Sequence, residues 1–247
     1  MKGVYNIGKN EFSEIGGSVN YSEIIHNKKF DQYKIIMQTN LQMISSNFTG
    51  REKYIKAIDD LLDKKDVIVL SGNGGIGKTQ IVLKYIKLHK KQYNNIAFVN
   101  CSSKENIIQE YSQLLSIDND ENTLGNMKHW AGLNKNYLFI YDNLDDEELK
   151  SEFFNKYMIS AANGKIIITS RLKDWENIIE INKFEEIESI EFLTKKTKLD
   201  NYNGAKFLSK ELDNFPLALE QAGAYIKNSI KKSYENYIEK YKKTENR

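Results

Sequence analysis

The chain has 247 residues, of which 40% are hydrophobic, and its 36 basic and 34 acidic side chains leave a formal net charge of +2. This length accommodates one large domain, or a medium domain with a small one. A charge so close to zero predicts neither nucleic acid nor an anionic membrane as a partner, and no stretch approaches the roughly 18 apolar residues of a membrane span. The single cysteine, Cys101, excludes an internal disulfide and is typical of a reducing, cytoplasmic compartment.

Regular structure is first predicted after an N-terminal segment, residues 1–45, whose role the sequence does not indicate. Thr49-Gly-Arg-Glu52 has the spacing of a capping box, in which a threonine and a glutamate cap the start of a helix. The helix that follows carries apolar side chains on one face, at Ile55, Ile58, Leu61 and Leu62. We expect a first domain over residues 46–187 that opens with this helix.

A glycine-rich turn joins a predicted strand, Val67–Leu70, to a predicted helix, Lys78–His89. Its sequence, Gly72-Asn-Gly-Gly75-Ile-Gly77-Lys78-Thr79, has the G-x-x-x-x-G-K-T spacing of a P-loop, a backbone cradle for nucleotide phosphates. The glycines permit positive φ and let backbone N–H groups face an anion, and the helix N-terminus adds its dipole. We expect Lys78 to bind the β- and γ-phosphates and the Thr79 hydroxyl to ligate Mg²⁺.

Further apolar runs predict strands over Ile96–Asn100, Tyr137–Tyr141 and Lys165–Thr169, and a short fifth strand is expected near Phe184–Ile187. Continuous apolar strands are typical of parallel sheets that are buried on both faces. The pattern therefore predicts an α/β domain with a doubly wound parallel sheet of about five strands, and ligands at the carboxyl ends of the strands. Helices are predicted between the strands, opening with a capping box at Ser102-Ser-Lys-Glu105, around Met127 and Trp130, and over Glu147–Tyr157.

After Ile187 the strand patterns stop, and residues 188–247 are predicted to form a second, helical domain. The apolar spacing indicates a small four-helix bundle. Its predicted helices cover Ile190–Lys195, Ala205–Leu212, Leu217–Ile226 and Tyr234–Tyr241.

Two charged residues follow strands of the first domain. Asp142 comes directly after Tyr137–Tyr141, the Walker B pattern, in which the carboxylate holds the Mg²⁺ hydration shell opposite the P-loop threonine. Arg171 follows Lys165–Thr169, where its guanidinium either grips a γ-phosphate or caps the end of the strand. Together with Lys78, these are the candidate catalytic residues.

The only proline, Pro216, is predicted at the first turn of a helix, where the missing N–H has no cost. A contact between its rigid ring and a nucleoside is compatible with that position.

Five segments occur here in the order in which they occur in NB-ARC domains, the STAND-class P-loop ATPases of apoptosome scaffolds, plant disease-resistance proteins and many bacterial regulators. The chain resembles this family over residues 46 to about 245, and most closely its bacterial members with tetratricopeptide repeats. The segments are Phe48-Thr-Gly50-Arg51-Glu52, Gly72–Thr79, Tyr141-Asp-Asn-Leu-Asp145, Ile168-Thr-Ser-Arg171 and Phe215-Pro-Leu-Ala-Leu219.

The resemblance implies that the chain binds ADP or ATP with Mg²⁺. It places Arg51 over adenine and Pro216 against the nucleoside, assigns the Mg²⁺ to Thr79 and Asp142, and makes Arg171 the sensor of the γ-phosphate. A nucleotide bound across both domains would make their relative orientation depend on ADP or ATP. The phosphates are assigned to the P-loop and the residues after it: Gly72, Gly74, Gly75, Ile76, Gly77, Lys78, Thr79 and Gln80.

The sequence departs from the family pattern in two respects. Many members have a second acidic residue after the Walker B aspartate, where it acts as a base toward water. Here Asn143 holds that position, and a neutral amide cannot accept the proton. Asp145 is a candidate substitute, and we expect slow ATP hydrolysis or none. The chain also ends where the family continues into a winged-helix domain and sensor repeats, so a natural short form, a split gene product or a fragment is expected.

Other functions are compatible with the same motifs. One is a non-hydrolysing interaction scaffold in which the nucleotide is structural. Another is a P-loop small-molecule kinase, although such an enzyme needs a lid with several arginines, and the chain has only Arg51, Arg171 and Arg247. For the preferred hypothesis, a cytoplasmic nucleotide switch, we expect a protein partner or self-association, and no nucleic acid or membrane.

Overall fold

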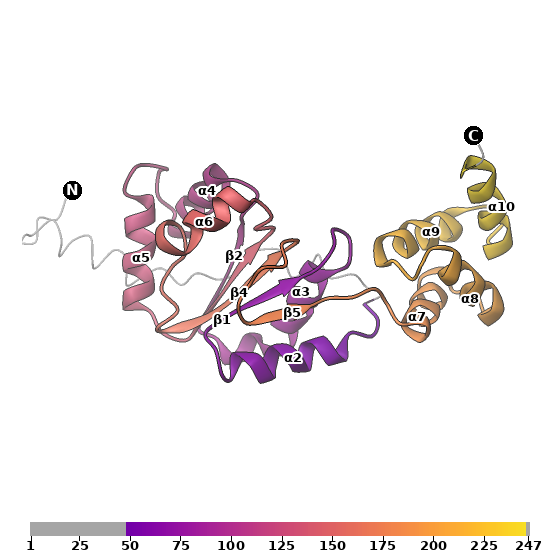
Figure 1. The fold of residues 1–247 in the computed structure, drawn as a ribbon, viewed down its shortest axis with the longest axis horizontal. Helices are drawn as coiled ribbons and strands as arrows, with labels where there is room; N and C mark the ends of the chain where they lie inside the picture. The colour runs from indigo at the N-terminus through magenta and orange to yellow at the C-terminus, as the bar shows by residue number, and fades with distance from the viewer. Residues whose placement is uncertain (1–47, 246–247) are drawn as a thin grey trace, which may run out of the picture. The chain divides into compact units, whose positions relative to one another are not determined.

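The computed structural model describes residues 48–245 (Figure 1). The predicted N-terminal segment, residues 1–45, lies outside the described residues.

Five parallel strands form one sheet in the order β2-β3-β4-β1-β5, which confirms the predicted doubly wound α/β fold. All residues of β3 are buried, as expected of a continuous apolar strand inside a parallel sheet. The strands are β1 (Val67–Ser71), β2 (Asn95–Asn100), β3 (Tyr137–Asp142), β4 (Gly164–Ser170) and β5 (Ile178–Glu180).

Helices cover both faces of the sheet (Figure 1). On one face lie α2 (Glu52–Leu62) and α3 (Lys78–His89), which is followed by the short 3₁₀ helix η2 (Lys90–Gln92). On the other lie α4 (Lys104–Leu115), α5 (Thr123–Leu133) and α6 (Glu147–Lys156).

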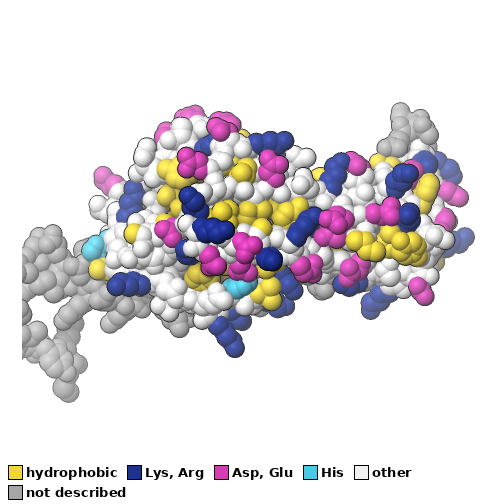
Figure 2. All heavy atoms as spheres, turned by 60° about the horizontal axis from the view of Figure 1, so that its bottom comes forward, with side chains coloured by type: hydrophobic (Ala, Val, Ile, Leu, Met, Phe, Trp, Pro, Cys, Tyr) yellow, Lys and Arg dark blue, Asp and Glu magenta, His cyan; other side chains and the backbone are white. Residues whose placement is uncertain are grey.

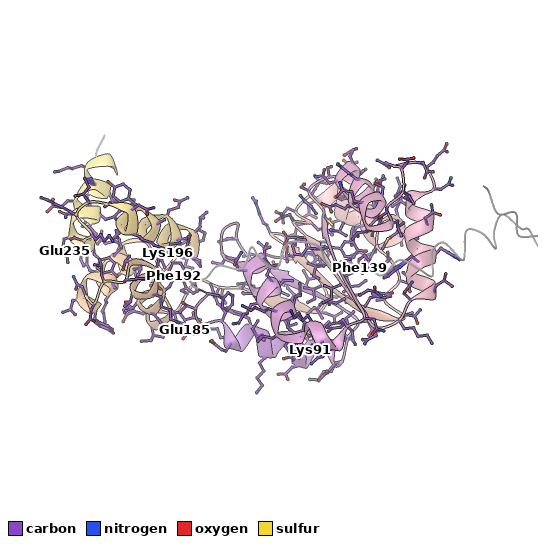
Figure 3. The ribbon with its side chains drawn as sticks, turned by 180° about the vertical axis from the view of Figure 1, so that it is seen from behind. Lys91, Phe139, Glu185, Phe192, Lys196 and Glu235 are labelled. Carbon is purple, nitrogen blue, oxygen red and sulfur yellow. The ribbon has the colours of Figure 1, made fainter. Side chains whose placement is uncertain are left out.

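Alternate residues of β3 supply the two cores. Leu138 and Ile140 belong to the apolar cluster with α2 and α3. Phe139 and Tyr141 point the other way, where Phe139 contacts Trp130 and Tyr141 contacts Phe153 edge to face. Figure 3 shows Phe139 inside this domain. The period-two alternation of a strand thus fixes both helical layers to one sheet.

The strand order determines which loops meet. β4 lies between β1 and β3, with Ser170 opposite Ser71 of β1 and Ile168 opposite Tyr141 of β3. The carboxyl end of β4 is therefore placed between the P-loop and Asp142.

The four helices after the sheet pack around their own apolar cluster, which confirms the predicted four-helix bundle. Pro216 occupies the first turn of α9, as its lack of an N–H predicts. On the face drawn in Figure 2, basic and acidic side chains are interspersed, in keeping with the nearly balanced charge. The helices are α7 (Glu186–Thr197), α8 (Tyr202–Glu211), α9 (Pro216–Asn228) and α10 (Tyr234–Glu245).

Two predicted helix caps are wrong. α2 begins after Arg51, not after Thr49, because Gly50 (φ 63°) and Arg51 (φ 70°) are both left-handed and turn the chain before the helix starts. The cap of α4 is Ser103, one residue after the predicted Ser102, and its hydroxyl accepts from the Asn106 N–H at 3.2 Å.

The predicted position of the fifth strand is also wrong. The strand is Ile178–Glu180, which pairs with β1, whereas α7 starts at Glu186 inside the predicted range. The signal for that helix start is the acidic pair three residues apart, since the Glu185 N–H donates to Oε2 of Glu188 at 2.8 Å.

Candidate functional site

The P-loop joins the end of β1 to the start of α3. Gly75 (φ 75°) and Gly77 (φ 99°) adopt left-handed conformations that other residues rarely reach. Gly75 is required for a second reason, because a Cβ added there would lie 2.8 Å from Cδ2 of Leu217 in α9. The loop therefore has the backbone of an anion cradle, and the helical domain lies against it.

Lys78 extends back along this loop. Its Nζ donates to the carbonyl oxygens of Gly72 (2.7 Å) and Asn73 (3.2 Å), and the residue is only 7% exposed. Burial lowers the pKa of the Lys78 ammonium, while the nearby carboxylates of Asp145 and Asp142 act in the opposite direction. A buried ammonium whose hydrogen bonds go to carbonyl oxygens of its own loop suits the binding of phosphate.

Asp142, the last residue of β3, meets two threonine hydroxyls. Its Oδ1 accepts from Thr169 at 2.6 Å and from Thr79 at 2.9 Å. Burial raises the pKa of the Asp142 carboxyl, and the two hydroxyl bonds partly oppose this shift. A hydroxyl and a carboxylate side by side fit the ligands of Mg²⁺, which usually keeps several waters and takes phosphate oxygens as well. No group of three metal-binding side chains occurs within residues 48–245, so the phosphates and waters would complete such a site.

Thr169 is a site residue that the sequence analysis missed. Besides its bond to Asp142, its Oγ1 accepts from the Asn143 N–H at 3.0 Å. The signal was a polar β-branched residue at the end of an apolar strand. Its importance follows only from the strand order, because β4 separates β1 from β3.

Arg171 follows β4 and lies beside the loop, with its guanidinium against Gly74: a Cβ added at Gly74 would lie 3.2 Å from Cζ of Arg171. Asp145 binds this arginine with both carboxylate oxygens. Oδ1 accepts from the Arg171 backbone N–H at 2.7 Å, and Oδ2 lies 2.8 Å from Nε. The candidate substitute base is therefore engaged by a cation.

Arg51 lies at the opposite end of the site, and only 3% of the residue is exposed. Its guanidinium donates to the carbonyl oxygens of Asn182 (2.7 Å) and Ile76 (3.2 Å) and lies over the ring of Phe184, 4.4 Å from its centroid. Its backbone N–H donates to Oε1 of Glu188 at 2.8 Å. Arg51 thus ties the P-loop to the linker before α7, a contact that sequence spacing did not reveal.

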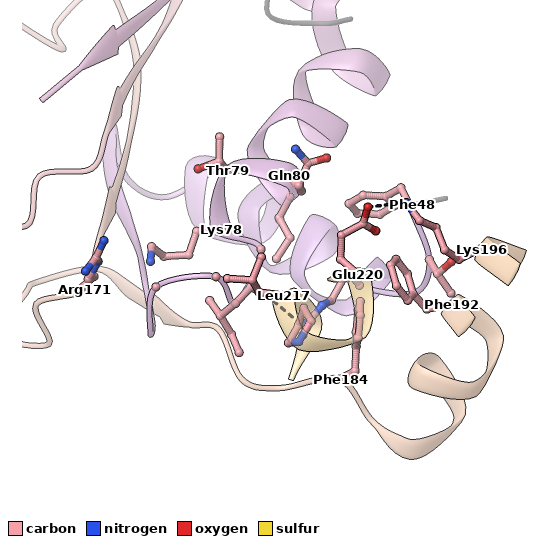
Figure 4. Close-up of a pocket in the computed structure, with 18 of the residues that line it drawn as sticks. Phe48, Lys78, Thr79, Gln80, Arg171, Phe184, Phe192, Lys196, Leu217 and Glu220 are labelled. Atoms are coloured by element: carbon pink, nitrogen blue, oxygen red, sulfur yellow. Dashed lines mark hydrogen bonds and ion pairs between the residues drawn. The ribbon is translucent and has the colours of Figure 1, made fainter. Parts of the chain in front are cut away.

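A cavity of about 620 Å³ extends between these two ends (Figure 4). Its size is typical of small-molecule sites. One wall comes from the P-loop and α3 and the other from α7 and α9, where Lys196 forms an ion pair with Glu220. The residues of the predicted site that line it are Arg51, Gly74, Gly75, Ile76, Gly77, Lys78, Thr79, Gln80, Arg171 and Pro216.

Gly72 and Asp142 do not line the cavity directly. Gly72 packs closely against the segment after β5, since a Cβ there would lie 2.7 Å from the Ile181 carbonyl oxygen. Asp142 is connected to the cavity by its hydrogen bond from Thr79, which does line it. Asn143 lines the cavity, at the position where many members of the family have an acidic residue.

In the part of the chain that the structure describes, no helix has the length and apolar character of a membrane span.

The sequence profile of the NB-ARC domain matches residues 51–202. A nucleotide-binding leucine-rich repeat (NLR)-like protein of Hyaloscypha variabilis is 24% identical, over 80% of this chain and 24% of that protein. This chain therefore spans about a quarter of the length of that curated relative.

Similar solved structures come from two Pyrococcus species. The Walker-type ATPase of Pyrococcus abyssi superposes with a TM-score of 0.56 at 16% identity, over 81% of this chain and 74% of that one. A STAND protein with a tetratricopeptide repeat sensor from Pyrococcus horikoshii has a TM-score of 0.46 at 17% identity, over 70% of this chain and 29% of that one.

Proposed function

The chain belongs to the NB-ARC family of P-loop NTPases, and from this premise we propose that it is a switch that binds ADP or ATP with Mg²⁺ in the cavity between its two domains. The observation that carries the proposal is the lining of that cavity. A glycine cradle with a buried lysine lies at one end, and side chains of the helical domain lie at the other.

In this proposal the phosphates lie against the P-loop, where the backbone N–H groups and the Lys78 ammonium neutralise their charge. Thr79 and Asp142 hold Mg²⁺ and its waters. Arg171 faces the position of the γ-phosphate, and Pro216 and Leu217 face the nucleoside. Arg51 acts mainly by fixing the linker beside the base, since its donors already bind backbone carbonyls.

A switch follows from the two-sided lining. A ligand shifts a conformational equilibrium only by as much as it binds one state better than the other. A nucleotide that contacts both the P-loop and α9 binds best when the two domains are closed around it. The terminal phosphate, which ATP has and ADP lacks, is the group that distinguishes the two nucleotide states.

We further propose that ATP hydrolysis is slow or absent. Asn143 cannot accept a proton, and both oxygens of Asp145 already bind Arg171. The same observation favours a second candidate, a non-hydrolysing scaffold in which the nucleotide only stabilises the fold. In either case we place the protein in the cytoplasm, on the basis of its lone, buried Cys101, with a protein partner or self-association as the output of the switch.

The test is to identify what the purified protein retains. Denatured protein should release an adenine nucleotide, detected by ion-pair chromatography and mass spectrometry, in a ratio approaching one per chain. The Lys78→Ala variant should release none. A parallel ATPase assay separates the two candidates, because the switch turns over ATP slowly and above the Lys78→Ala background, whereas the scaffold does not. Folded protein that neither retains nor takes up adenine nucleotide at millimolar concentration contradicts both.

A further inference from the structure

The ion pair between Asp145 and Arg171 lies beside the P-loop, at Gly74. Both carboxylate oxygens of Asp145 bind the same arginine, one through the backbone N–H at 2.7 Å and the other through Nε at 2.8 Å. The Asp145 side chain is 25% exposed and the Arg171 side chain 64% exposed. The pair is therefore partly exposed, with Arg171 lining the cavity, and the fold does not depend on it as it would on a buried charge pair.

The position of the pair matters more than its strength. Figure 4 shows Arg171 and Lys78 on the same side of the P-loop. The guanidinium lies against Gly74. A Cβ added at Gly74 would lie 3.2 Å from Cζ and 3.3 Å from Nε of Arg171. The Asp145 carboxylate also acts to raise the pKa of the Lys78 ammonium, against the effect of burial. One carboxylate thus acts on both cations that a terminal phosphate would use.

The Asp145 carboxylate should repel a bound triphosphate more than a bound diphosphate. The γ-phosphate would bring additional negative charge to the cations that Asp145 already neutralises, and charges a few ångströms apart in a partly buried site repel strongly. ADP ends one phosphate earlier and avoids most of this repulsion. To grip a γ-phosphate through Nε and one terminal nitrogen, Arg171 would have to give up Asp145.

We propose that Asp145 competes with the γ-phosphate for Arg171 and so biases the site toward ADP over ATP. This inference rests on the proposed function and deepens it by naming the residue that sets the nucleotide preference. Asp145 is a positioning residue, since it acts through Arg171. The terminal phosphate must displace it before the arginine is available.

The experiment is isothermal titration of the nucleotide-free protein with ADP and with the non-hydrolysable ATP analogue AMP-PNP, both with Mg²⁺. Asp145→Asn keeps the shape of the side chain and removes its charge. In this variant the ratio of the AMP-PNP Kd to the ADP Kd should fall about threefold to fivefold, the scale of one partly exposed ion pair. Asp145→Glu restores the charge and should keep the wild-type ratio.

Asp66→Asn is the matched control. Asp66, just before β1, pairs at 2.9 Å with Lys165 near the start of β4, at the opposite end of that strand from Arg171. Removing this pair should leave the ratio unchanged. Equal melting temperatures of the nucleotide-free variants would show that the substitutions act on binding and not on folding.

A double substitution tests the route through Arg171. In an Arg171→Ala background, Asp145→Asn should change the ratio much less than in the wild type, because the arginine for which the carboxylate competes is gone and only its effect on Lys78 remains. An unchanged or increased ratio in Asp145→Asn alone overturns the inference. An equally large effect in the Arg171→Ala background overturns it too. In both cases, tight binding of ADP to the wild type would still support the proposed function. Wild-type protein that binds neither nucleotide overturns both.

Discussion

Two buried cations, Lys78 and Arg51, line the two ends of one cavity, and they are held in opposite ways. The Lys78 ammonium donates to carbonyl oxygens of Gly72 and Asn73, within its own loop. The Arg51 guanidinium donates to Ile76 in the P-loop and to Asn182 and Lys183 in the distant linker. The first contacts are local and can be exchanged for phosphate, whereas the second connect segments that only the fold brings together.

This difference separates binding from stability. At the phosphate end, polar groups are available to a ligand, so substitutions there should change binding and leave the folded chain largely intact. At the linker end, Arg51 satisfies buried carbonyls and contacts the buried Glu188. A substitution there should first destabilise the protein. The following predictions test this division, in order of decreasing effect.

Lys78→Ala should abolish the stabilisation that Mg-ADP gives to the wild type. A ligand at a thousand times its Kd adds about 4 kcal/mol to the unfolding free energy, and the variant should lose nearly all of it. Thermal unfolding with and without Mg-ADP measures the effect. Lys104→Ala, which removes a partly exposed cation paired with Glu152, is the control and should keep the full shift. An equal nucleotide-induced shift in Lys78→Ala would contradict the assignment of the phosphate end.

Arg51→Ala should lower the unfolding free energy of the nucleotide-free protein by about 3 kcal/mol, because it leaves buried carbonyls without donors. Urea denaturation followed by circular dichroism measures the loss. Lys53→Ala serves as the control from the same helix region, since Lys53 is a half-exposed cation that pairs with Glu185; it should cost less than about 1 kcal/mol. A similar loss of unfolding free energy in the two variants would contradict the claim that Arg51 stabilises the fold at the linker end of the cavity.

Asn143→Asp should raise the rate of ATP hydrolysis by at least about tenfold, since a positioned general base contributes a factor of about a hundred or more in many enzymes. Asn143 lines the cavity with φ 64°, a conformation that aspartate also tolerates. Asn136→Asp changes another left-handed asparagine, before β3, and should have no effect in the same phosphate-release assay. Unchanged hydrolysis in Asn143→Asp would show that the missing acid does not limit turnover.

Asp142→Asn should have the smallest effect on the empty protein, and it should be stabilising. Burial raises the pKa of the Asp142 carboxyl, so the folded state holds the proton more tightly than the unfolded state and stability falls as pH rises through the folded-state pKa. Asparagine carries no charge to bury and keeps an oxygen that accepts from the hydroxyls of Thr79 and Thr169. Urea denaturation should show a larger advantage at pH 7.5 than near the ordinary aspartate pKa of 3.8, while Mg²⁺ should no longer strengthen nucleotide binding. A destabilised variant at pH 7.5 would contradict this account.

The sequence predicted the sheet because apolar β-branched runs and a glycine-rich turn are local signals. Strand order is not local, so the role of Thr169 between β1 and β3 could not be predicted. The short edge strand β5 was misplaced because three residues carry too little periodicity. Phe184–Ile187, where the strand was expected, is apolar only at its two ends, and Glu185 within it opens a helix. The start of α2 was missed because the left-handed turn at Arg51 depends on Glu188, far along the chain.

The central claim is that the two ends form one site for a nucleotide. Hydrogen–deuterium exchange of the whole chain, with and without saturating Mg-ADP, tests it most directly. We predict slower exchange both in the P-loop, residues 72–80, and in the linker and the start of α9, residues 182–220. Protection confined to the P-loop, or none in either segment, would contradict the claim.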